Sequence, residues 1–396
     1  MEACMNEKMY ELGAAPSAIR ELFAYGLARK AEIGAENVFD FSLGNPSVPA
    51  PDAIAQAMAR ATELPPMQLH SYSPAQGHPF CRAAIANNLN RRFGTAYSAD
   101  DLYLTMGAAA ALDACFTALA NPGDEIIVNA PYFPEYRVWI ENTGATCIEV
   151  PTRPADFQLD VPALRAAITA KTRAIVVNSP NNPVGTVYTR QNLEELSTML
   201  REKQEEFGAP IYLISDEPYR ELAYGDEQPS WVPALYENTL VCYSWSKSFS
   251  LPGERIGYVL VPPAAADARR LYLAVCGAGR ALGYVCAPTV LQQTIADCID
   301  EPVNVEPYVR NRKLLTDMLD ELGYEYIEPA GAFYLWVKAL EPDAKAFSEK
   351  AKTHELLIVA SDSFGVGGWV RISYCVGEDV IRNSRDAFAA LKADYA

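Results

Sequence analysis

The sequence predicts an α/β fold in two parts: a large domain with a mostly parallel central sheet flanked by helices, and a smaller α+β domain. The chain has 396 residues, of which 50% are hydrophobic, and this is more than one ordinary core accommodates. From about residue 100 to 260, apolar runs rich in β-branched residues alternate with amphipathic helical segments. Runs this continuously apolar are typical of strands buried on both faces, as in a parallel sheet.

The expected strands of the large domain follow from these runs. They cover residues 101–105, 125–129, 173–178, 211–215, 239–244 and 256–261. Amphipathic helical segments such as 109–119 and 191–206 lie between the first five strands, whereas only a loop around Lys247 separates the last two. Helical connections between strands indicate a sheet whose strands run mainly in parallel.

The two ends of the chain have a different pattern. Long amphipathic helices are expected at 305–322 and 379–395, and short strands at 332–337 and 369–374. We therefore expect a large domain at 52–287, a small domain built from 17–51 and 288–396, and an N-terminal arm at 1–16.

The net charge of −17 at pH 7 argues against two classes of partner. A negative protein repels the phosphates of nucleic acids and of anionic membranes, so we expect neither. An anionic substrate would then need individual arginines or lysines to bind it. The nine cysteines form no CxxC pair, and no signal peptide or transmembrane stretch is apparent. These features predict reduced cysteines and a cytoplasmic protein.

Functional candidates follow several of the predicted strands, and ligands of open α/β sheets bind at the carboxyl ends of the strands. The first strand is followed by small residues that open a helix, including Ala108 and Ala109. Their bare N–H groups could hold a phosphate, although close packing explains them equally well. Later strands are followed by the aromatic turn 130–136, Asn182, Asp216, and the group Ser244, Ser246, Lys247 and Arg255.

Together these residues predict a pocket for pyridoxal 5′-phosphate. A lysine forms a Schiff base with this cofactor, a carboxylate keeps its pyridine nitrogen protonated, and backbone, serine and arginine groups hold its phosphate. Alone, Lys247 is an even choice between a chemical amine and a lysine whose stem lies on apolar surface. The other residues of the set favour the chemical role.

The order of these motifs resembles the class I and II aminotransferases of fold type I, which use pyridoxal phosphate. The motifs are TMGAAAAL at 105–112, APYFPEY at 130–136, NSPNNPVG at 178–185, SDEPY at 215–219, SWSKSFSLPGERIGY at 244–258 and RISY at 371–374. Landmarks run from Gly44 to Arg371, so the resemblance covers nearly the whole chain. The S-x-S-K motif followed by G-x-R-x-G is highly specific for this family.

The resemblance implies roles for the residues around the cofactor ring. Lys247 corresponds to the lysine that forms the aldimine and transfers the proton, and Asp216 to the aspartate that pairs with the pyridine nitrogen. Tyr219 and Asn182 are similar to the two donors to the phenolic oxygen of the cofactor. Phe133 aligns with the aromatic side chain that stacks on the ring, and Tyr132 is a weaker alternative.

The resemblance also implies how the phosphate is held. Ser244, Arg255 and the backbone N–H groups of Ala108 and Ala109 match the phosphate contacts. In this family the middle of that loop often carries a hydroxyl or amide side chain. Because both positions are alanine here, only main-chain contacts are expected from them.

Three further residues match the substrate side and the subunit contact of the family. Arg371 corresponds to the arginine that binds the substrate α-carboxylate, and Gly44 and Asn182 lie beside that group. Tyr72, in YSPAQG, is similar to a tyrosine that reaches the phosphate in the neighbouring subunit. The resemblance therefore implies a homodimer with composite sites.

The resemblance implies an enzyme that moves the amino group of an amino acid to a 2-oxo acid such as 2-oxoglutarate, in a ping-pong reaction. Aspartate is the first donor to expect, and aromatic amino acids are the second. In one subgroup, an arginine downstream of the lysine reaches across the dimer for the side-chain carboxylate. Arg280 is the nearest candidate by spacing, and a helix or subunit contact explains it at least as well.

Three other functions compete with this one. A pyridoxal phosphate-dependent C–S β-lyase shares all the pocket residues named above. A ligand-sensing regulator would need a basic DNA-binding segment, and the N-terminal residues are not strongly basic. The glycines at 363–369 lack the spacing of a dinucleotide fingerprint, which disfavours an oxidoreductase. His70, His78 and His354 are too scattered for a metal site or a catalytic triad.

Overall fold

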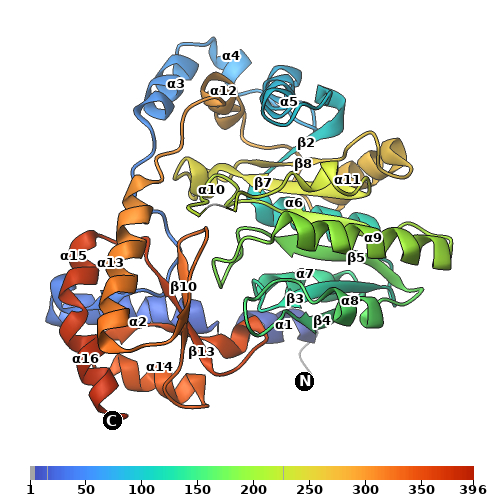
Figure 1. The fold of residues 1–396 in the computed structure, drawn as a ribbon. Helices are drawn as coiled ribbons and strands as arrows, with labels where there is room; N and C mark the ends of the chain where they lie inside the picture. Colours follow the sequence, from blue (N-terminus) through green and yellow to red (C-terminus); the bar gives the residue numbers. More distant parts are fainter. Residues whose placement is uncertain (1–4, 16, 226) are drawn as a thin grey trace.

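The computed structural model describes residues 5–15, 17–225 and 227–396 (Figure 1). Cys4, one of the nine cysteines, lies outside these ranges, and the eight described cysteines are free thiols. A seven-stranded sheet with its helices forms the larger part, and two small sheets form the second part with helices from both ends of the chain. None of the described helices combines the length and apolar character needed to cross a bilayer.

The central sheet has the strand order β2-β8-β7-β6-β5-β3-β4. The strands are β2 (Leu102–Thr105), β3 (Glu125–Ala130), β4 (Thr146–Pro151), β5 (Thr172–Asn178), β6 (Tyr212–Asp216), β7 (Thr239–Ser244) and β8 (Gly257–Leu260). Neighbouring strands are parallel except that β8 is antiparallel to both β7 and β2. The connection from β7 to β8, residues 245–256, contains only the four-residue helix α10, and an antiparallel return does not need the longer helical crossover that is usual between parallel strands.

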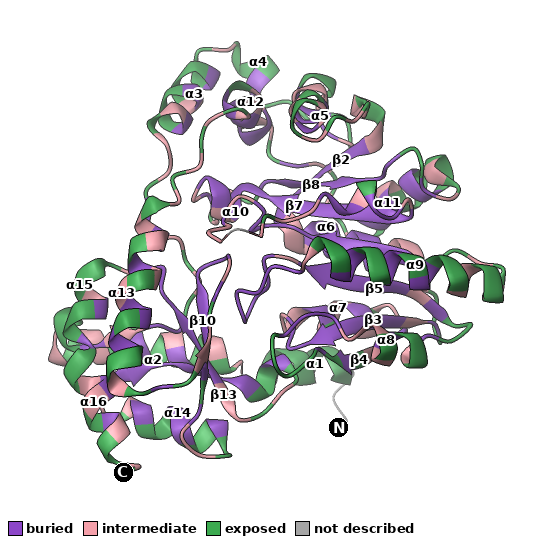
Figure 2. Cartoon of the chain, viewed as in Figure 1, coloured by how far each residue is buried: buried purple, intermediate pink, exposed green. Residues whose placement is uncertain are grey.

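Several α-helices in the described part of the chain accompany this sheet. They are α3 (Asp52–Thr62), α4 (Pro66–Leu69), α5 (Pro79–Phe93), α6 (Gly107–Leu119), α7 (Glu135–Asn142), α8 (Val161–Ala167), α9 (Arg190–Phe207), α10 (Trp245–Ser248), α11 (Ala268–Ala281) and α12 (Thr289–Cys298). Along β7, Leu240 and Cys242 pack with α6 and α11, whereas Val241 and Tyr243 pack with α5 and α12. Because successive strand residues point to opposite faces, both faces of the sheet are covered and its inner strands are buried (Figure 2).

The second part combines residues from both ends of the chain. An antiparallel sheet has the order β12-β13-β10-β9, and β1 pairs in parallel with β11. The strands are β1 (Phe39–Asp40), β9 (Tyr326–Ile327), β10 (Tyr334–Lys338), β11 (Leu356–Leu357), β12 (Val359–Ala360) and β13 (Trp369–Ser373). The helices are α2 (Ala18–Ile33), α13 (Glu306–Leu322), α14 (Ala344–Lys352), α15 (Glu378–Asn383) and α16 (Arg385–Ala393). α1 (Glu7–Ala14) lies instead beside the large part, where Nζ of Lys8 donates to the carbonyl of Glu141 at 2.8 Å (Figure 1). Phe41, Phe333 and Phe388 lie in the core of this part.

The structure confirms the α/β fold class and contains every predicted strand. It also contains β4 and the two-residue strands β1, β9, β11 and β12, which the sequence does not predict. β4 lies at the edge of the sheet and buries Cys147 on one face and Val150 on the other, while three of its six residues are exposed, so it lacks the continuous apolar run of the inner strands. The helix expected at 379–395 is two helices that meet at Ser384.

The division into domains stays a prediction, with one change. α12 packs against α3 and α5 beside the large sheet, whereas the sequence-based division assigns it to the small domain. We therefore propose that the second boundary lies after α12, and that the other boundaries stay as expected.

Candidate active site

A cavity of about 260 Å³ lies where β5, β6 and β7 end. Asn178, Asp216 and Ser244 are the last residues of these strands, and the parallel register places Asn178 opposite Asp216. Gly44 and Arg371, from the second part of the molecule, complete the wall. The cavity therefore lies between the two parts, at the edge of the sheet where the sequence predicts a ligand.

The structure brings most of the predicted site residues to this cavity; Tyr72, Arg280 and the stacking alternative Tyr132 do not line it. The predicted residues that line it are Gly44, Ala108, Ala109, Phe133, Asn182, Asp216, Tyr219, Ser244, Lys247, Arg255 and Arg371. They are spread along most of the sequence, so only the folded chain places them together.

Lys247 lies in α10, the short helix that follows β7 directly. Its Nζ donates a hydrogen bond of 2.7 Å to the carbonyl oxygen of Gly44. Burial lowers the pKa of Lys247 to about 8, and the positive charges of Arg371 and Arg255 act in the same direction. Close to that pH much of the amine is neutral and able to accept a proton, which is not true of an ordinary exposed lysine.

Asp216 is buried at the end of β6. Its Oδ2 accepts a hydrogen bond of 2.5 Å from the hydroxyl of Tyr136, and its backbone oxygen accepts one of 2.9 Å from the amide of Asn178. Its Oδ1 has no hydrogen-bond partner among the described residues. Burial raises the pKa of Asp216 to about 7, although the Tyr136 hydroxyl opposes this. A buried, unpaired carboxylate oxygen is an acceptor for a proton-bearing ligand.

The start of α6 forms an anion-binding corner together with the end of β7. Gly107 opens the helix with φ +84°, and a Cβ there would lie 2.8 Å from Nη2 of Arg255. Arg255 donates from Nη1 to the carbonyl of Pro252 at 3.0 Å, which holds its guanidinium against this corner. The hydroxyls of Ser244 and Ser246 lie 2.6 Å apart beside it. Free N–H groups at a positive helix end, hydroxyls and a guanidinium suit a phosphate.

Arg371 faces the same cavity from β13. Its Nη2 donates to the carbonyl of Ser42 at 2.6 Å, and its Nη1 donates to Oδ1 of Asn182 at 3.1 Å. Its Nε has no partner among the described residues. The guanidinium carbon lies 4.6 Å from the centre of the Tyr334 ring. Packed in this way, the planar cation is oriented to bind a carboxylate.

Gly44 lies against the phenol of Tyr334. A Cβ at this position would be 2.0 Å from the Tyr334 hydroxyl oxygen, so only glycine fits without displacing the ring. The same hydroxyl lies 2.9 Å from the hydroxyl of Tyr219. The two tyrosines thus fix each other at the floor of the cavity.

The aromatic wall consists of Phe133 and Trp139, whose ring centres are 6.1 Å apart. Tyr132, the alternative for stacking, points elsewhere: its hydroxyl donates to Glu149 and it does not line this cavity. The geometry therefore favours Phe133 over Tyr132.

Two predicted residues lie away from the cavity of their own chain. Tyr72 is 88% exposed, as a residue that serves a neighbouring subunit would be. Arg280 is exposed near the end of α11 and is not among the residues that line the cavity.

Several residues of this site are not predicted from the sequence, including Tyr136, Asn178, Tyr334 and Trp139. Asn178 could have been found, because it ends a strand that lies next to Asp216 in a parallel sheet. The three aromatic residues carry no such signal, since each also suits an ordinary apolar core. Among the described residues no group of three histidine, cysteine, aspartate or glutamate side chains is arranged for a metal ion.

Comparison with protein families gives one match that spans most of the chain. The model described as "Aminotransferase class I and II" matches residues 36–388. The aspartate/prephenate aminotransferase of Thermus thermophilus is 31% identical over 351 residues, which cover 87% of this chain and 89% of the relative. The aspartate aminotransferase of Streptomyces avermitilis is 31% identical over 360 residues, which cover 86% of each chain.

Solved structures agree with these relatives. The crystal structure of an amino transferase from Eubacterium rectale superposes with a TM-score of 0.97 at 52% identity, and 99% of each chain is covered. The aspartate aminotransferase of Thermus thermophilus with maleate gives a TM-score of 0.87 at 29% identity, covering 99% of this chain and 100% of the other.

Proposed function

The chain belongs to the class I and II aminotransferases, and on this premise we propose which of its residues carry the reaction. It is a pyridoxal phosphate-dependent enzyme that transfers an amino group between an amino acid and a 2-oxo acid. This assignment favours an enzyme over the ligand-sensing regulator and over the oxidoreductase. The residues, the donor and the assembly are proposals.

The residues of the cavity fit the cofactor. The strongest observation is the unpaired Oδ1 of Asp216, which is buried in the same cavity as the amine of Lys247. A protonated pyridine nitrogen would satisfy this oxygen and offset the cost of burying the carboxylate. Ser244, Arg255 and the start of α6 would hold the phosphate, which is the arrangement that an anion requires.

When bound, the cofactor withdraws electrons from the α-carbon of the amino acid and so makes its proton acidic. The amine of Lys247 would accept this proton at Nζ and later release it, which completes a 1,3-proton transfer. Arg371 would bind the α-carboxylate of the amino acid, and Asn182 and Tyr219 would donate hydrogen bonds to the phenolic oxygen of the cofactor. Phe133 would exclude water from one side of the ring.

Replacement of the lysine tests this assignment. Lys247→Ala should abolish both turnover and the visible absorbance of the bound cofactor, because no other amine lines the cavity among the described residues. Lys345→Ala, which removes an exposed lysine of α14, is the matched control and should leave both unchanged. Multiple turnovers of an amino donor by the Lys247→Ala protein would contradict the role of Lys247.

We propose a homodimer in which Tyr72 completes the site of its partner. The exposure of Tyr72 and its absence from its own cavity support this. Co-expression of a Lys247→Ala chain with a Tyr72→Phe chain tests it, since each heterodimer then holds one doubly altered site and one intact site. Activity no higher than that of the two separate variants would contradict shared sites.

The donor is proposed to be aspartate first and an aromatic amino acid second, with 2-oxoglutarate as acceptor. The names of the Thermus thermophilus and Streptomyces avermitilis relatives support aspartate. The cavity itself is lined by Ile19, Leu43 and Trp139 near its apolar wall, which suits an aromatic side chain. Binding of the side-chain carboxylate of aspartate would therefore depend on a cation from the partner subunit. Arg280 is the candidate for this cation.

Two variants separate these donors. Arg280→Ala should raise the KM for aspartate and lower its kcat/KM about 30-fold, the effect of losing about 2 kcal/mol from a charge-assisted pair. It should spare an aromatic donor, and Arg270→Ala on the same helix should affect neither. Trp139→Ala should weaken the aromatic donor more than aspartate. An equal fall in kcat/KM for both donors would indicate that Arg280 has a structural role and does not bind the substrate.

The C–S β-lyase remains a second possibility for the same cavity, because both reactions use the same residues. A panel of donors that includes cystathionine decides between them. Release of a thiol faster than amino transfer to any 2-oxo acid would indicate the lyase. A cytoplasmic location stays a prediction, and fractionation of cells that produce the protein tests it.

A further inference from the structure

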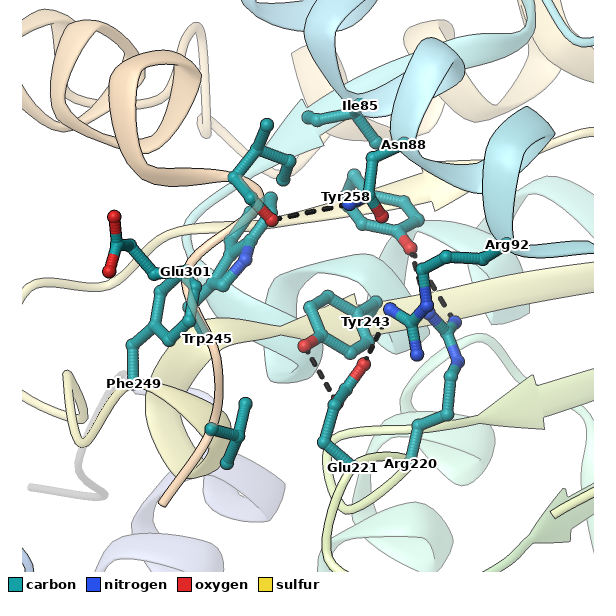
Figure 3. Close-up of a pocket in the computed structure, with 12 residues that line it drawn as sticks. Ile85, Asn88, Arg92, Arg220, Glu221, Tyr243, Trp245, Phe249, Tyr258 and Glu301 are labelled. Carbon is teal, nitrogen blue, oxygen red and sulfur yellow. Dashed lines mark hydrogen bonds and ion pairs between the residues drawn. The ribbon is translucent and has the colours of Figure 1, made fainter. Parts of the chain in front are cut away.

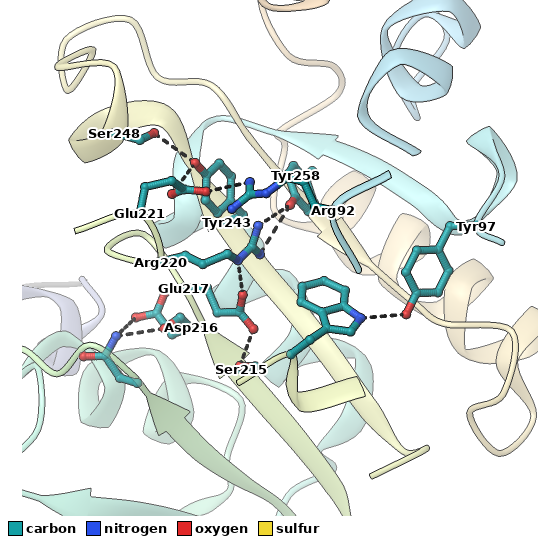
Figure 4. A network of polar contacts seen from close by, with 12 residues as sticks. Arg92, Tyr97, Ser215, Asp216, Glu217, Arg220, Glu221, Tyr243, Ser248 and Tyr258 are labelled. Atoms are coloured by element: carbon teal, nitrogen blue, oxygen red, sulfur yellow. Dashed lines mark hydrogen bonds and ion pairs between the residues drawn. The ribbon is translucent and has the colours of Figure 1, made fainter. Parts of the chain in front are cut away.

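A group of buried polar side chains lies behind Asp216, outside the cavity described above (Figure 4). We name it the Arg220 cluster and define it as Glu217, Arg220, Glu221, Tyr243 and Ser248. Glu217 and Arg220 belong to the turn that follows β6, Tyr243 lies on β7, and Ser248 follows Lys247 in α10. The cluster therefore joins the segment that carries Asp216 to the helix that carries Lys247.

The centre of the cluster is an ion pair. Glu217 and Arg220 are only 4% and 7% exposed. Nε of Arg220 donates to Oε2 of Glu217, and the hydroxyl of Ser215 donates to Oε1 at 2.6 Å. Nη1 of Arg220 also donates to the hydroxyl of Tyr258 at 3.3 Å. Both charged groups are thus paired, as buried charges must be.

Aromatic rings surround the guanidinium of Arg220. Its central carbon lies 4.6 Å from the ring centre of Tyr243, 5.0 Å from that of Trp231 and 5.7 Å from that of Phe93. The faces of such rings attract a cation and most strongly when water is excluded. The rings therefore hold the charge of Arg220 at a fixed place next to Glu217.

A second connection runs to α10. The hydroxyl of Tyr243 donates to Oε2 of Glu221 at 2.9 Å and lies 2.9 Å from the hydroxyl of Ser248. Arg92 donates to Oε1 of Glu221 at 2.8 Å. A cavity of about 40 Å³ borders this connection (Figure 3). Its volume admits a water molecule and is too small for a substrate, so the cluster supports the site and is not a second one.

The ion pair acts on Asp216 through charge. Tyr136 faces Asp216 from α7, Asn178 from β5, Cys242 from β7 and Tyr219 from the following turn. Among the described residues, Glu217 is the only acidic neighbour whose charge raises the pKa of Asp216. Arg220 forms an ion pair with Glu217 and so neutralises this charge. Without Arg220, the negative charge of Glu217 would disfavour a second anion at Asp216.

We propose that Arg220 is a positioning residue for the cofactor: its caged guanidinium neutralises Glu217, and this favours the anionic form of Asp216 that pairs with the cofactor nitrogen. The inference rests on the role proposed above for Asp216. It predicts opposite effects for the two halves of the ion pair. A merely structural role would predict that both losses act in the same direction.

The experiment measures the affinity of the full-length, cofactor-free protein for pyridoxal 5′-phosphate as a function of pH, by quenching of tryptophan fluorescence. In every protein compared, Lys247 is also replaced by alanine, because its amine, with a pKa of about 8, would add a pH dependence of its own. Affinity should then rise with pH as Asp216 loses its proton, and the bend is the pH at which this rise levels off. Arg220→Met should move this bend about one pH unit higher, and Glu217→Gln should move it lower. Arg220→Lys and the double variant Glu217→Gln/Arg220→Met should stay close to the protein that carries Lys247→Ala alone. The titration of the free cofactor is the same in every measurement, so differences report the protein.

The Asp216→Asn protein separates the two proposals. If the bend persists in that protein, the role of Asp216 itself is wrong. If the bend disappears there but is not moved by Glu217→Gln, or moves in the same direction for both single variants, the inference about Arg220 is wrong. If Arg220→Met does not fold, the decision rests on Glu217→Gln and the double variant. A bend at equal pH in these two proteins then overturns the inference.

Discussion

Replacement of Lys247 by methionine should stabilise the cofactor-free protein at neutral pH, even though it removes the amine that the reaction requires. The reason is the buried position of the ammonium group, which lowers its pKa from 10.5 to about 8. In the folded protein the charged form is therefore penalised relative to the unfolded chain. Methionine has a similar length and carries no charge, so it removes this penalty.

The magnitude follows from the same shift. At about 1.4 kcal/mol for each pH unit, the penalty on charged Lys247 is roughly 3 kcal/mol. Methionine also loses the hydrogen bond to the carbonyl of Gly44, which costs about 1 kcal/mol. Lys247→Met should therefore be about 2 kcal/mol more stable at pH 7.

The sign of this difference depends on pH. Below about pH 8 the lysine is charged in both states, and the full penalty is present. Between about pH 8 and pH 10.5 the folded protein releases the proton while the unfolded chain keeps it, so the unaltered protein gains stability as the pH rises. Above that range only the lost hydrogen bond remains, and the variant should be the less stable protein.

Urea unfolding of the cofactor-free proteins between pH 6.5 and pH 10 measures this effect, at one protein concentration because a dimer unfolds in a concentration-dependent way. Lys345→Met, at an exposed lysine, is the control and should show no such dependence on pH. A Lys247→Met protein that is less stable at pH 7, or a difference that is the same at every pH, would refute the reasoning.

Three further predictions concern the walls of the cavity. Arg371→Lys keeps the positive charge but loses the planar guanidinium that binds a carboxylate through two hydrogen bonds. The kcat/KM for amino donors should therefore fall about 30-fold, or about 2 kcal/mol, while the absorbance of the bound cofactor stays the same. Unchanged kinetics would contradict carboxylate binding at Arg371. Gly44→Ala should lower kcat/KM because its Cβ meets the Tyr334 hydroxyl, and a second change, Tyr334→Phe, should restore part of the loss. Tyr136→Phe removes the hydrogen bond that lowers the pKa of Asp216, so cofactor affinity measured by fluorescence should drop at pH 7 and recover at higher pH; equal affinity at every pH would exclude this link.

The sequence predicts those parts of the site whose residue types are unusual for their place. A carboxylate such as Asp216 directly after a buried strand needs a partner, and so does an amine such as Lys247 among aromatic and small residues. Tyr136 and Tyr334 give no such signal, because tyrosines are common among apolar neighbours. Only the folded structure shows that Tyr136, on α7, and Tyr334, on β10, both line the cavity, where their hydroxyls bind Asp216 and Tyr219.

The same reasoning explains where the predicted fold is incomplete. The inner strands are visible because both faces are buried, whereas β4 has one neighbour and half of its side chains in water. The packing of α12 against α3 cannot be predicted from the sequence either, because the apolar face of an amphipathic helix does not indicate which element it packs against.

The pairing of β1 with β11 has a consequence for synthesis on the ribosome. Phe39 pairs with Leu356, so the first strand of the chain has no partner until almost the whole protein has been made. At about 5–20 residues per second, this interval lasts roughly 15 to 60 seconds. During it, the nascent segment that later carries Gly44 exposes apolar residues such as Phe41, a binding site for chaperones that the finished protein no longer presents.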